Sequence, residues 1–220
     1  MTEYELRKEL ARICRLLYER ELVIANAGNV SARAGRGRFL TTPSGTCKGW
    51  LEPADFVTVD ESGRKVAGSR PPSSEFDMHR VIYEVRPDVQ AIVHAHPALA
   101  TAFTVAGRSL GEPILTEGLL TIGQIATAAY ATPGTPAVGN SLRHLVRDHD
   151  AILLAHHGAV TCGPDLDTAY WYMEIVEHTA KTRLAAEALG GARSLPPGEV
   201  DALLRTRQRL RGGLAAGRPR

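Results

Sequence analysis

The segment Val89-Gln90-Ala91-Ile92-Val93-His94-Ala95-His96 is mostly apolar, ends in two histidines and is followed directly by Pro97. It predicts a buried strand, and proline is favoured as the first residue of the helix that we expect to continue to Gly107. Side chains two positions apart on a strand point to the same face of the sheet. His94 and His96 can therefore bind one metal ion from one side, although such a pair alone is a weak signal.

A second apolar segment has the same kind of ending. Residues 151–155 predict another buried strand, and His156-His157-Gly158 follows it. Glycine lets the backbone turn tightly directly after the histidines, and adjacent strand residues face opposite sides. One of these two imidazoles should therefore point toward His94 and His96. Three imidazoles from two strand ends would form a catalytic metal site with positions left open for a substrate.

The rest of the chain alternates between helical and strand-like patterns. Thr2 and Glu5 fit a capping box at the start of a helix over residues 3–20, and a strand is expected over residues 56–60. Further helices are expected over residues 75–85, 141–147, 165–189 and 197–210. The alternation predicts a layered α/β domain, and the short, hairpin-like connections mean that its sheet need not be parallel. We expect a single domain over residues 1–210 and a poorly ordered basic tail over residues 211–220.

The composition is that of an ordinary globular protein. Of the 220 residues, 44% are hydrophobic, which suffices for a sizeable core, and the formal net charge is only +2. The positive excess comes from arginines near the C-terminus, so no nucleic-acid-binding face is expected. There is no apolar run long enough for a membrane helix and no signal-peptide pattern. With three cysteines and no CxxC spacing, the cytoplasm is the expected location.

Three polar segments combine small residues with hydroxyl, amide or carboxylate side chains. They are residues 26–31, residues 41–45 and Ser73-Ser74-Glu75. Each alone is more often a turn or a helix cap, because serine and asparagine hydrogen-bond to nearby backbone groups. Together, beside a histidine cluster, they predict a cradle for a phosphate group with Glu75 as a general base.

The same segments, taken together, closely resemble the class II aldolase family. The matching motifs are Gly28-Asn29-Val30-Ser31, Thr42-Pro43-Ser44-Gly45, Pro72-Ser73-Ser74-Glu75, His94-Ala95-His96 and His156-His157-Gly158, in the same order and at similar spacing over about residues 5–190. The resemblance implies a three-layer α/β/α fold with a central, mainly antiparallel sheet flanked by helices. It also implies a homotetramer with active sites near the subunit boundaries.

The resemblance further implies roles for individual residues. His94, His96 and His157 would bind a divalent metal ion, usually Zn²⁺, with Mn²⁺ or Co²⁺ as alternatives. Glu75 would ligate the metal at rest and act as the base in catalysis. The positions that match the substrate-phosphate site are Gly28, Asn29, Ser44, Gly45, Ser73 and Ser74.

The implied reaction is the retro-aldol cleavage of a small ketose 1-phosphate, similar to L-fuculose 1-phosphate, into dihydroxyacetone phosphate and an aldehyde. Family aldolases place a tyrosine acid where this chain has Leu115. Leucine cannot donate a proton, so Glu117 and Tyr130 are the candidate proton donors.

Other reactions of the family remain alternatives. A methylthioribulose-phosphate dehydratase would use a glutamate such as Glu117, and a sugar-acid phosphate decarboxylase is a further lyase. A ribulose-phosphate 4-epimerase ranks lower, because residues 97–147 contain no aspartate. A non-catalytic scaffold similar to the adducin head domain is the remote alternative, since that domain lacks the metal ligands that this chain keeps.

Overall fold

One eight-stranded sheet forms the centre of the molecule in the computed structural model, which describes the backbone of residues 1–216 and the side chains of residues 1–211. The strands are β1 (Asn29–Gly35), β2 (Arg38–Thr41), β3 (Val57–Asp60), β4 (Lys65–Ala67), β5 (Ala91–Ala95), β6 (Ala126–Ala128), β7 (Ala151–Leu154) and β8 (Gly158–Gly163). Their order is β4-β3-β2-β1-β5-β8-β7-β6, and every neighbouring pair is antiparallel except β6 and β7. The expectation of a central, mainly antiparallel sheet is confirmed.

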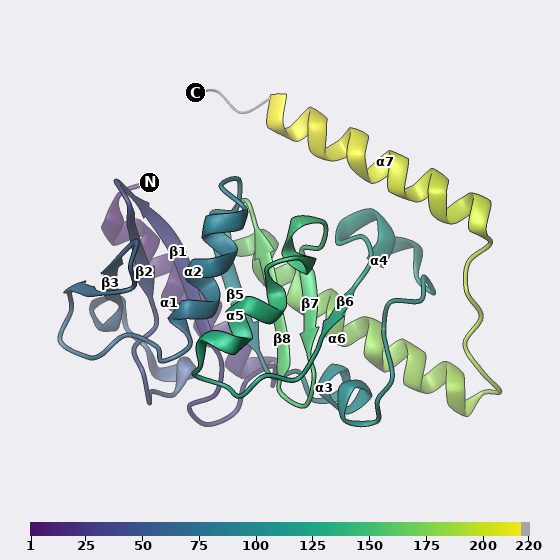
Figure 1. Ribbon diagram of the computed structural model, residues 1–220, viewed down its shortest axis with the longest axis horizontal. Helices are drawn as coiled ribbons and strands as arrows, with labels where there is room; N and C mark the ends of the chain where they lie inside the picture. Colours follow the sequence, from purple (N-terminus) through teal and green to yellow (C-terminus); the bar gives the residue numbers. More distant parts are fainter. Residues whose placement is uncertain (217–220) are drawn as a thin grey trace.

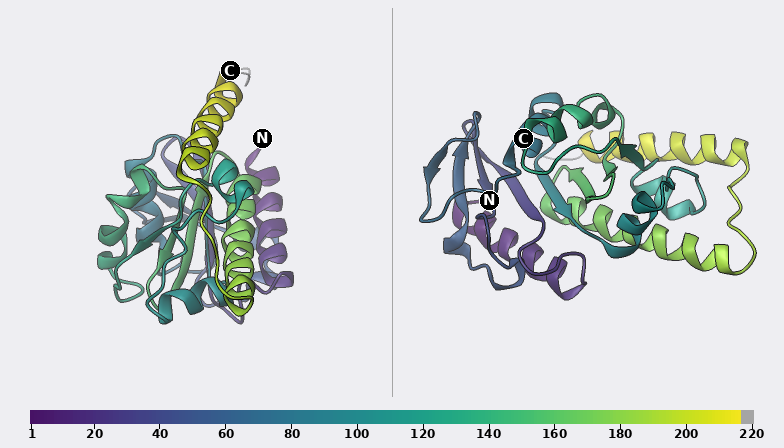
Figure 2. Two further views of the ribbon diagram at one scale, coloured as in Figure 1. Left: turned by 90° about the vertical axis from the view of Figure 1, so that its right-hand side faces the viewer. Right: turned by 60° about the horizontal axis from the view of Figure 1, so that its bottom comes forward.

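Helices cover both faces of this sheet (Figures 1 and 2). On one face lie α1 (Glu3–Glu19) and α6 (Leu166–Ala188), with α3 (Ala98–Val105) packed against α6. On the other face lie α2 (Phe76–Val85) and α5 (Pro136–Leu142). The short helix α4 (Thr116–Thr121) and the C-terminal helix α7 (Pro197–Ala216) pack against each other beside these layers. The three-layer α/β/α architecture is therefore also confirmed.

The central strand β5 contributes to two hydrophobic cores, one on each face of the sheet. Val93 packs in the core under α1 and α6, whereas its neighbour Ile92 packs in the core under α2 and α5. Both side chains have no exposed surface. Because alternate residues of a strand point to opposite faces, a strand buried on both sides needs an unbroken apolar run. This explains the apolar sequence that precedes His94.

Most of the expected helices form, and the helix expected over residues 141–147 is wrong. The capping box at α1 is present: the Thr2 hydroxyl accepts from the Glu5 amide at 3.2 Å, and the Glu5 carboxylate accepts from the Thr2 amide at 2.6 Å. The helix α5 instead begins at Pro136, which suits a first helical turn, and ends at Leu142. Only a short 3₁₀ turn follows it, at Leu145–Arg147.

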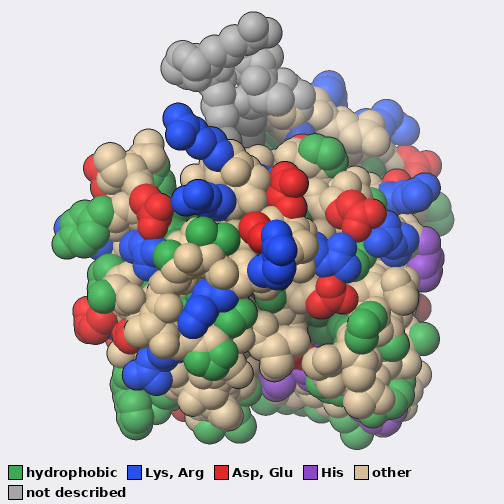
Figure 3. Space-filling model, turned by 60° about the vertical axis from the view of Figure 1, so that its left-hand side comes forward, with side chains coloured by type: hydrophobic (Ala, Val, Ile, Leu, Met, Phe, Trp, Pro, Cys, Tyr) green, Lys and Arg blue, Asp and Glu red, His purple; other side chains and the backbone are tan. Residues whose placement is uncertain are grey.

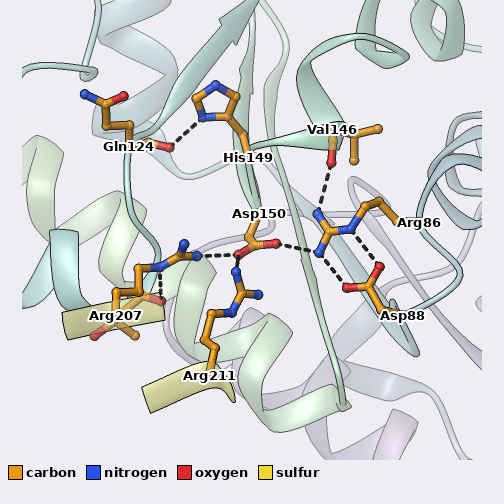
Figure 4. Close-up of polar contacts among 9 residues, drawn as sticks. Arg86, Asp88, Gln124, Val146, His149, Asp150, Arg207 and Arg211 are labelled. Atoms are coloured by element: carbon orange, nitrogen blue, oxygen red, sulfur yellow. Dashed lines mark hydrogen bonds and ion pairs between the residues drawn. The ribbon is translucent and has the colours of Figure 1, made fainter. Parts of the chain in front are cut away.

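The C-terminal helix is longer than expected, and ion pairs to Asp150 hold it to the domain beside its packing against α4. It continues past residue 210 to Ala216, and residues 217–220 of the expected basic tail lie outside the described residues. Asp150, which is 3% exposed, accepts hydrogen bonds or ion pairs from three guanidinium groups (Figure 4). Arg207 lies 2.5 Å and Arg211 2.7 Å from one carboxylate oxygen, and Arg86 lies 3.2 Å from the other.

The surface carries charges of both signs. On the face shown in Figure 3, lysine and arginine side chains are interspersed with aspartate and glutamate. Among the described residues, no helix is both long and apolar enough to cross a membrane.

Candidate metal centre

Three histidines meet at one end of the central strands. Each of His94, His96 and His157 offers a ring nitrogen that lies within 4.8 Å of the other two. His94 and His96 come from β5 and the residue just after it, and His157 comes from the turn between β7 and β8. Since β5 pairs antiparallel with β8, the end of β5 lies beside the start of β8. The expectation that one residue of the His156-His157 pair points toward the other histidines is met by His157.

Gly158 allows the turn to lie close to β5. A Cβ atom at this position would overlap the Ala95 carbonyl oxygen and lie 2.9 Å from the His96 ring, so only glycine fits without a shift. The preceding residue, His156, has a φ of 57°, an uncommon backbone conformation for a non-glycine residue. The turn therefore directs His157 into the cluster and leaves His156 exposed.

Glu75 faces the same cluster from the N-terminal end of α2. Its two carboxylate oxygens lie 3.3 Å from His94 Nε2 and 3.3 Å from His157 Nε2. Asn29, which is paired with His94 across β1 and β5, donates a hydrogen bond from Nδ2 to Glu75 at 2.9 Å. One carboxylate oxygen of Glu75 is buried and has no hydrogen-bond partner among the described residues.

This arrangement fits a bound cation. The Nδ1 atom of His94 donates to the Ala159 carbonyl at 2.9 Å, a contact that orients its Nε2 toward the cluster. That Nε2 atom faces a carboxylate oxygen of Glu75 and lies 3.1 Å from His96 Nε2. A carboxylate and two imidazole nitrogens that converge in this way are mutually stabilised only by a proton or a metal ion among them. Three imidazoles and one carboxylate are also a common ligand set for zinc and related divalent ions.

The electrostatics keep the ligands in the forms that bind metals. Burial and repulsion from His94 lower the pKa of His96 to about 3 and that of His157 to about 4. Burial alone would raise the pKa of Glu75, but its contact with His94 and the charges of His94 and His157 outweigh burial and lower it to about 2. At neutral pH the two imidazoles are uncharged and the carboxylate is ionised.

The segments expected to hold a phosphate group surround Glu75. The backbone amide of Ser44 donates to the Pro71 carbonyl and that of Ser73 to the Thr42 carbonyl, both at 3.0 Å, so residues 42–45 and 71–75 lie side by side. Asn29 links residues 26–31 to this pair through Glu75. The expected phosphate-site residues that line these loops are Gly28, Asn29, Ser44, Gly45, Ser73 and Ser74, of which Gly45 and Ser74 are exposed.

A family model for the class II aldolase and adducin N-terminal domain matches residues 8–184. The chain belongs to this family. Class II aldolases are metal-dependent enzymes, in agreement with the three-histidine cluster.

The relatives of this member of the family carry more than one activity. The chain is 34% identical over 178 residues to an L-fuculose phosphate aldolase of Methanocaldococcus jannaschii, covering 81% of this chain and 95% of that protein. It is 33% identical over 183 residues to a 3-oxo-tetronate 4-phosphate decarboxylase of Escherichia coli, covering 81% and 86%. The crystal structure of YgbL from Klebsiella pneumoniae, named as an aldolase, epimerase or decarboxylase candidate, superposes with a TM-score of 0.86 at 31% identity, covering 92% and 99%.

The two candidate proton donors lie in different places in the molecule. The Tyr130 ring, which is 60% exposed, lies 6.3 Å from the ring of His156, the residue before His157. Glu117 instead lines a cavity of about 490 Å³ with Leu115, Arg20 and residues of α6. Among the described residues, neither side chain has a hydrogen bond or ion pair with the three clustered histidines.

One buried residue near the histidine cluster, His79, is not among the candidate residues that the sequence analysis identifies. His79 is fully buried, and its Nδ1 atom lies 2.7 Å from the Ser31 hydroxyl, which in turn lies 2.9 Å from the Tyr83 hydroxyl. Burial and the charge of His94 lower the pKa of His79 to about 3. The signal in the sequence was its position one helical turn after Glu75, on the same side of α2.

Proposed function

We propose that the protein is a metal-dependent lyase that cleaves a carbon–carbon bond in a small phosphorylated sugar or sugar acid. The convergence of three histidines and Glu75 carries this proposal. The loops around Glu75 and the relatives that act on phosphorylated compounds support the substrate class. The expected substrate remains a ketose 1-phosphate similar to L-fuculose 1-phosphate.

In this proposal His94, His96, His157 and Glu75 hold a divalent ion, with Zn²⁺ as the expected metal. When bound, such an ion would supply a Lewis acid to stabilise the negative charge that develops as the carbon–carbon bond breaks. Glu75 is ionised at neutral pH and is therefore able to accept the proton of the substrate hydroxyl as the bond breaks. The same group returns the proton to carbon. The loops that hold the phosphate orient the reacting end.

A second reaction, decarboxylation of a 3-oxo acid phosphate, is favoured by one observation. Leu115 is apolar and stands where the aldolases of the family place a tyrosine. Loss of carbon dioxide from a 3-oxo acid leaves the same kind of enediolate as retro-aldol cleavage, but no hydroxyl proton has to be removed first. A chain without that tyrosine can still catalyse this reaction, and the Escherichia coli relative has this activity in its name.

A paired substrate assay tests both reactions. Metal-loaded protein is incubated with L-fuculose 1-phosphate or with 3-oxo-tetronate 4-phosphate, and dihydroxyacetone phosphate, aldehyde and carbon dioxide are measured. Dihydroxyacetone phosphate with aldehyde identifies the aldolase, and dihydroxyacetone phosphate with carbon dioxide identifies the decarboxylase. We expect about one metal ion per chain, lost together with activity in His96→Ala. A wild-type protein that binds no divalent metal, or that is inert toward both substrates when loaded, contradicts the proposal.

We also propose a homotetramer, on the basis of the resemblance to the family. Light scattering of the purified protein measures the mass of the assembly directly. A mass of one chain at micromolar concentration would contradict this assembly.

A further inference from the structure

Lys48 is a buried cation between two of the loops that surround Glu75. The residue is 2% exposed and begins the 3₁₀ turn Lys48–Trp50. Its ammonium group donates to the Asn26 carbonyl at 2.7 Å and to the Thr46 carbonyl at 2.7 Å. Asn26 lies two residues before Gly28, and Thr46 follows Gly45 directly. The side chain therefore ties the loop of residues 26–31 to the loop of residues 41–46.

This link adds to contacts that already hold the loops around Glu75 together. Asn29 joins the first loop to Glu75, and the hydrogen bonds at Ser44 and Ser73 join the second loop to the segment before Glu75. The first and second loops meet where β1 pairs with β2, and there the Thr42 hydroxyl accepts from the Val30 amide at 3.3 Å. Lys48 connects their other ends, at Asn26 and Thr46, and removal of the ammonium group would free these ends from each other.

The charge of Lys48 has no carboxylate partner. Among the described residues, no carboxylate oxygen lies within ion-pair distance of its ammonium group, and only two of its three N–H donors have an acceptor. Burial lowers the pKa of Lys48, and the charge of the more distant Glu75 carboxylate offsets this effect only in part. The pKa of His96 is lowered chiefly by burial and, to a smaller extent, by the charge of Lys48. The ammonium group is therefore within electrostatic reach of the metal ligands.

We infer that Lys48 is a positioning residue for the phosphate group of the substrate. It holds the two loops together and adds positive charge near them. The inference rests on the proposed function and extends it to a residue outside the expected phosphate site. An anion held by Gly28, Asn29, Ser44 and Ser73 would add a counter-charge to that of the Glu75 carboxylate, which lies beyond ion-pair distance of the ammonium group. A purely structural lysine would need no anion and would affect all substrates alike.

Phosphate binding is measured with inorganic phosphate by calorimetry, on metal-loaded wild type, Lys48→Met and Lys48→Arg. Lys65→Met, which removes an exposed lysine of β4, is the matched control. We expect Lys48→Met to bind phosphate about tenfold more weakly, equivalent to about 1.4 kcal/mol, with unchanged metal content. Lys48→Arg keeps the charge and should stay within about threefold of wild type. Wild-type phosphate affinity in Lys48→Met, or no phosphate binding by wild type, overturns the inference.

Steady-state kinetics separate positioning from a general structural role. Lys48→Met should raise KM for the phosphorylated substrate and leave kcat/KM for its unphosphorylated analogue nearly unchanged. Equal losses with both compounds would overturn the inference. The calorimetry requires no turnover. A wild-type protein without lyase activity would therefore contradict the proposed function, whereas the phosphate-binding measurement would still test the role of Lys48. An active enzyme with unchanged phosphate affinity in Lys48→Met would contradict only the role of Lys48.

A measurement on the wild type covers the case in which Lys48→Met does not fold. In protein labelled with ¹⁵N-lysine, phosphate should shift the ammonium resonance of Lys48 more than that of exposed Lys65. The absence of such a difference at saturating phosphate would overturn the inference.

Discussion

At the scale of single residues, the candidate metal centre and its surroundings contain ionisable groups whose pKa values are shifted by burial. His79 is the clearest case outside the histidine cluster, because it is fully buried between α2 and the sheet and its one hydrogen bond among the described residues is to the neutral Ser31 hydroxyl. Its pKa of about 3 means that it stays uncharged in the folded protein at any pH near neutrality. In the unfolded chain a histidine takes up a proton near pH 6.5.

The first prediction follows from this difference in proton uptake. Between pH 6.5 and about 3 the unfolded chain binds one more proton at His79 than the folded protein, so the free energy of unfolding falls as the pH falls. This one group contributes a loss of up to about 1.4 kcal/mol per pH unit in that window. His96 and His157 act in the same direction in the metal-free protein, so the readout is the difference between wild type and His79→Gln.

Urea unfolding of the metal-free protein at pH 7, 6 and 5 measures this slope. His79→Gln should lose less stability over this range than wild type, and His144→Gln, at an exposed histidine, is the matched control. Identical slopes for wild type and His79→Gln would contradict the assignment of an uncharged, buried His79.

At the scale of elements, the metal ligands depend on how closely the β7–β8 turn approaches β5. Gly158 makes that approach possible, because a methyl group there would meet the Ala95 carbonyl and the His96 ring. We therefore predict that Gly158→Ala loses about 1–3 kcal/mol of stability and binds metal more weakly, since the His96 ring must move. Denaturant unfolding and metal content per chain test both effects. Gly198→Ala, at an open position of α7, is the control and should keep the stability and metal content of wild type. If Gly158→Ala also kept both, the turn would be able to shift without cost, which would contradict the prediction.

The central strands, most of the flanking helices and the clustering of His94, His96 and His157 could be predicted from the sequence because they rest on local patterns. The apolar run before His94 and the glycine after His157 are visible without any knowledge of the partner strands. The position of α5 was wrong because the pattern after residue 140 was weighted above the start signal at Pro136. Lys48 and His79 were missed because their importance depends on burial and on contacts with residues distant in sequence, which no spacing rule reveals.

At the scale of the whole molecule, α7 is attached to the domain through the buried carboxylate of Asp150. We predict that Asp150→Ala costs about 3–5 kcal/mol, because it leaves Arg86, Arg207 and Arg211 without their shared counter-charge. Hydrogen exchange should accelerate over residues 197–216 more than over the central strands. Asp148→Asn, at an exposed residue nearby, is the control. Unchanged exchange in α7 would show that its packing against α4 suffices to hold it.

The register of β5 also has a consequence for how the protein folds during its synthesis. His94 lies beside Asn29 and Glu75 only when β5 has paired with β1, and His157 joins them only when β8 has paired on the other side of β5. A chain still leaving the ribosome has no complete set of ligands until residues beyond 158 have emerged, and pairing of such distant segments is slow. If these residues hold a divalent ion as proposed, the complete ligand set forms only in the finished sheet. Scarcity of metal in the cell would then shorten the lifetime of completed molecules rather than delay their formation.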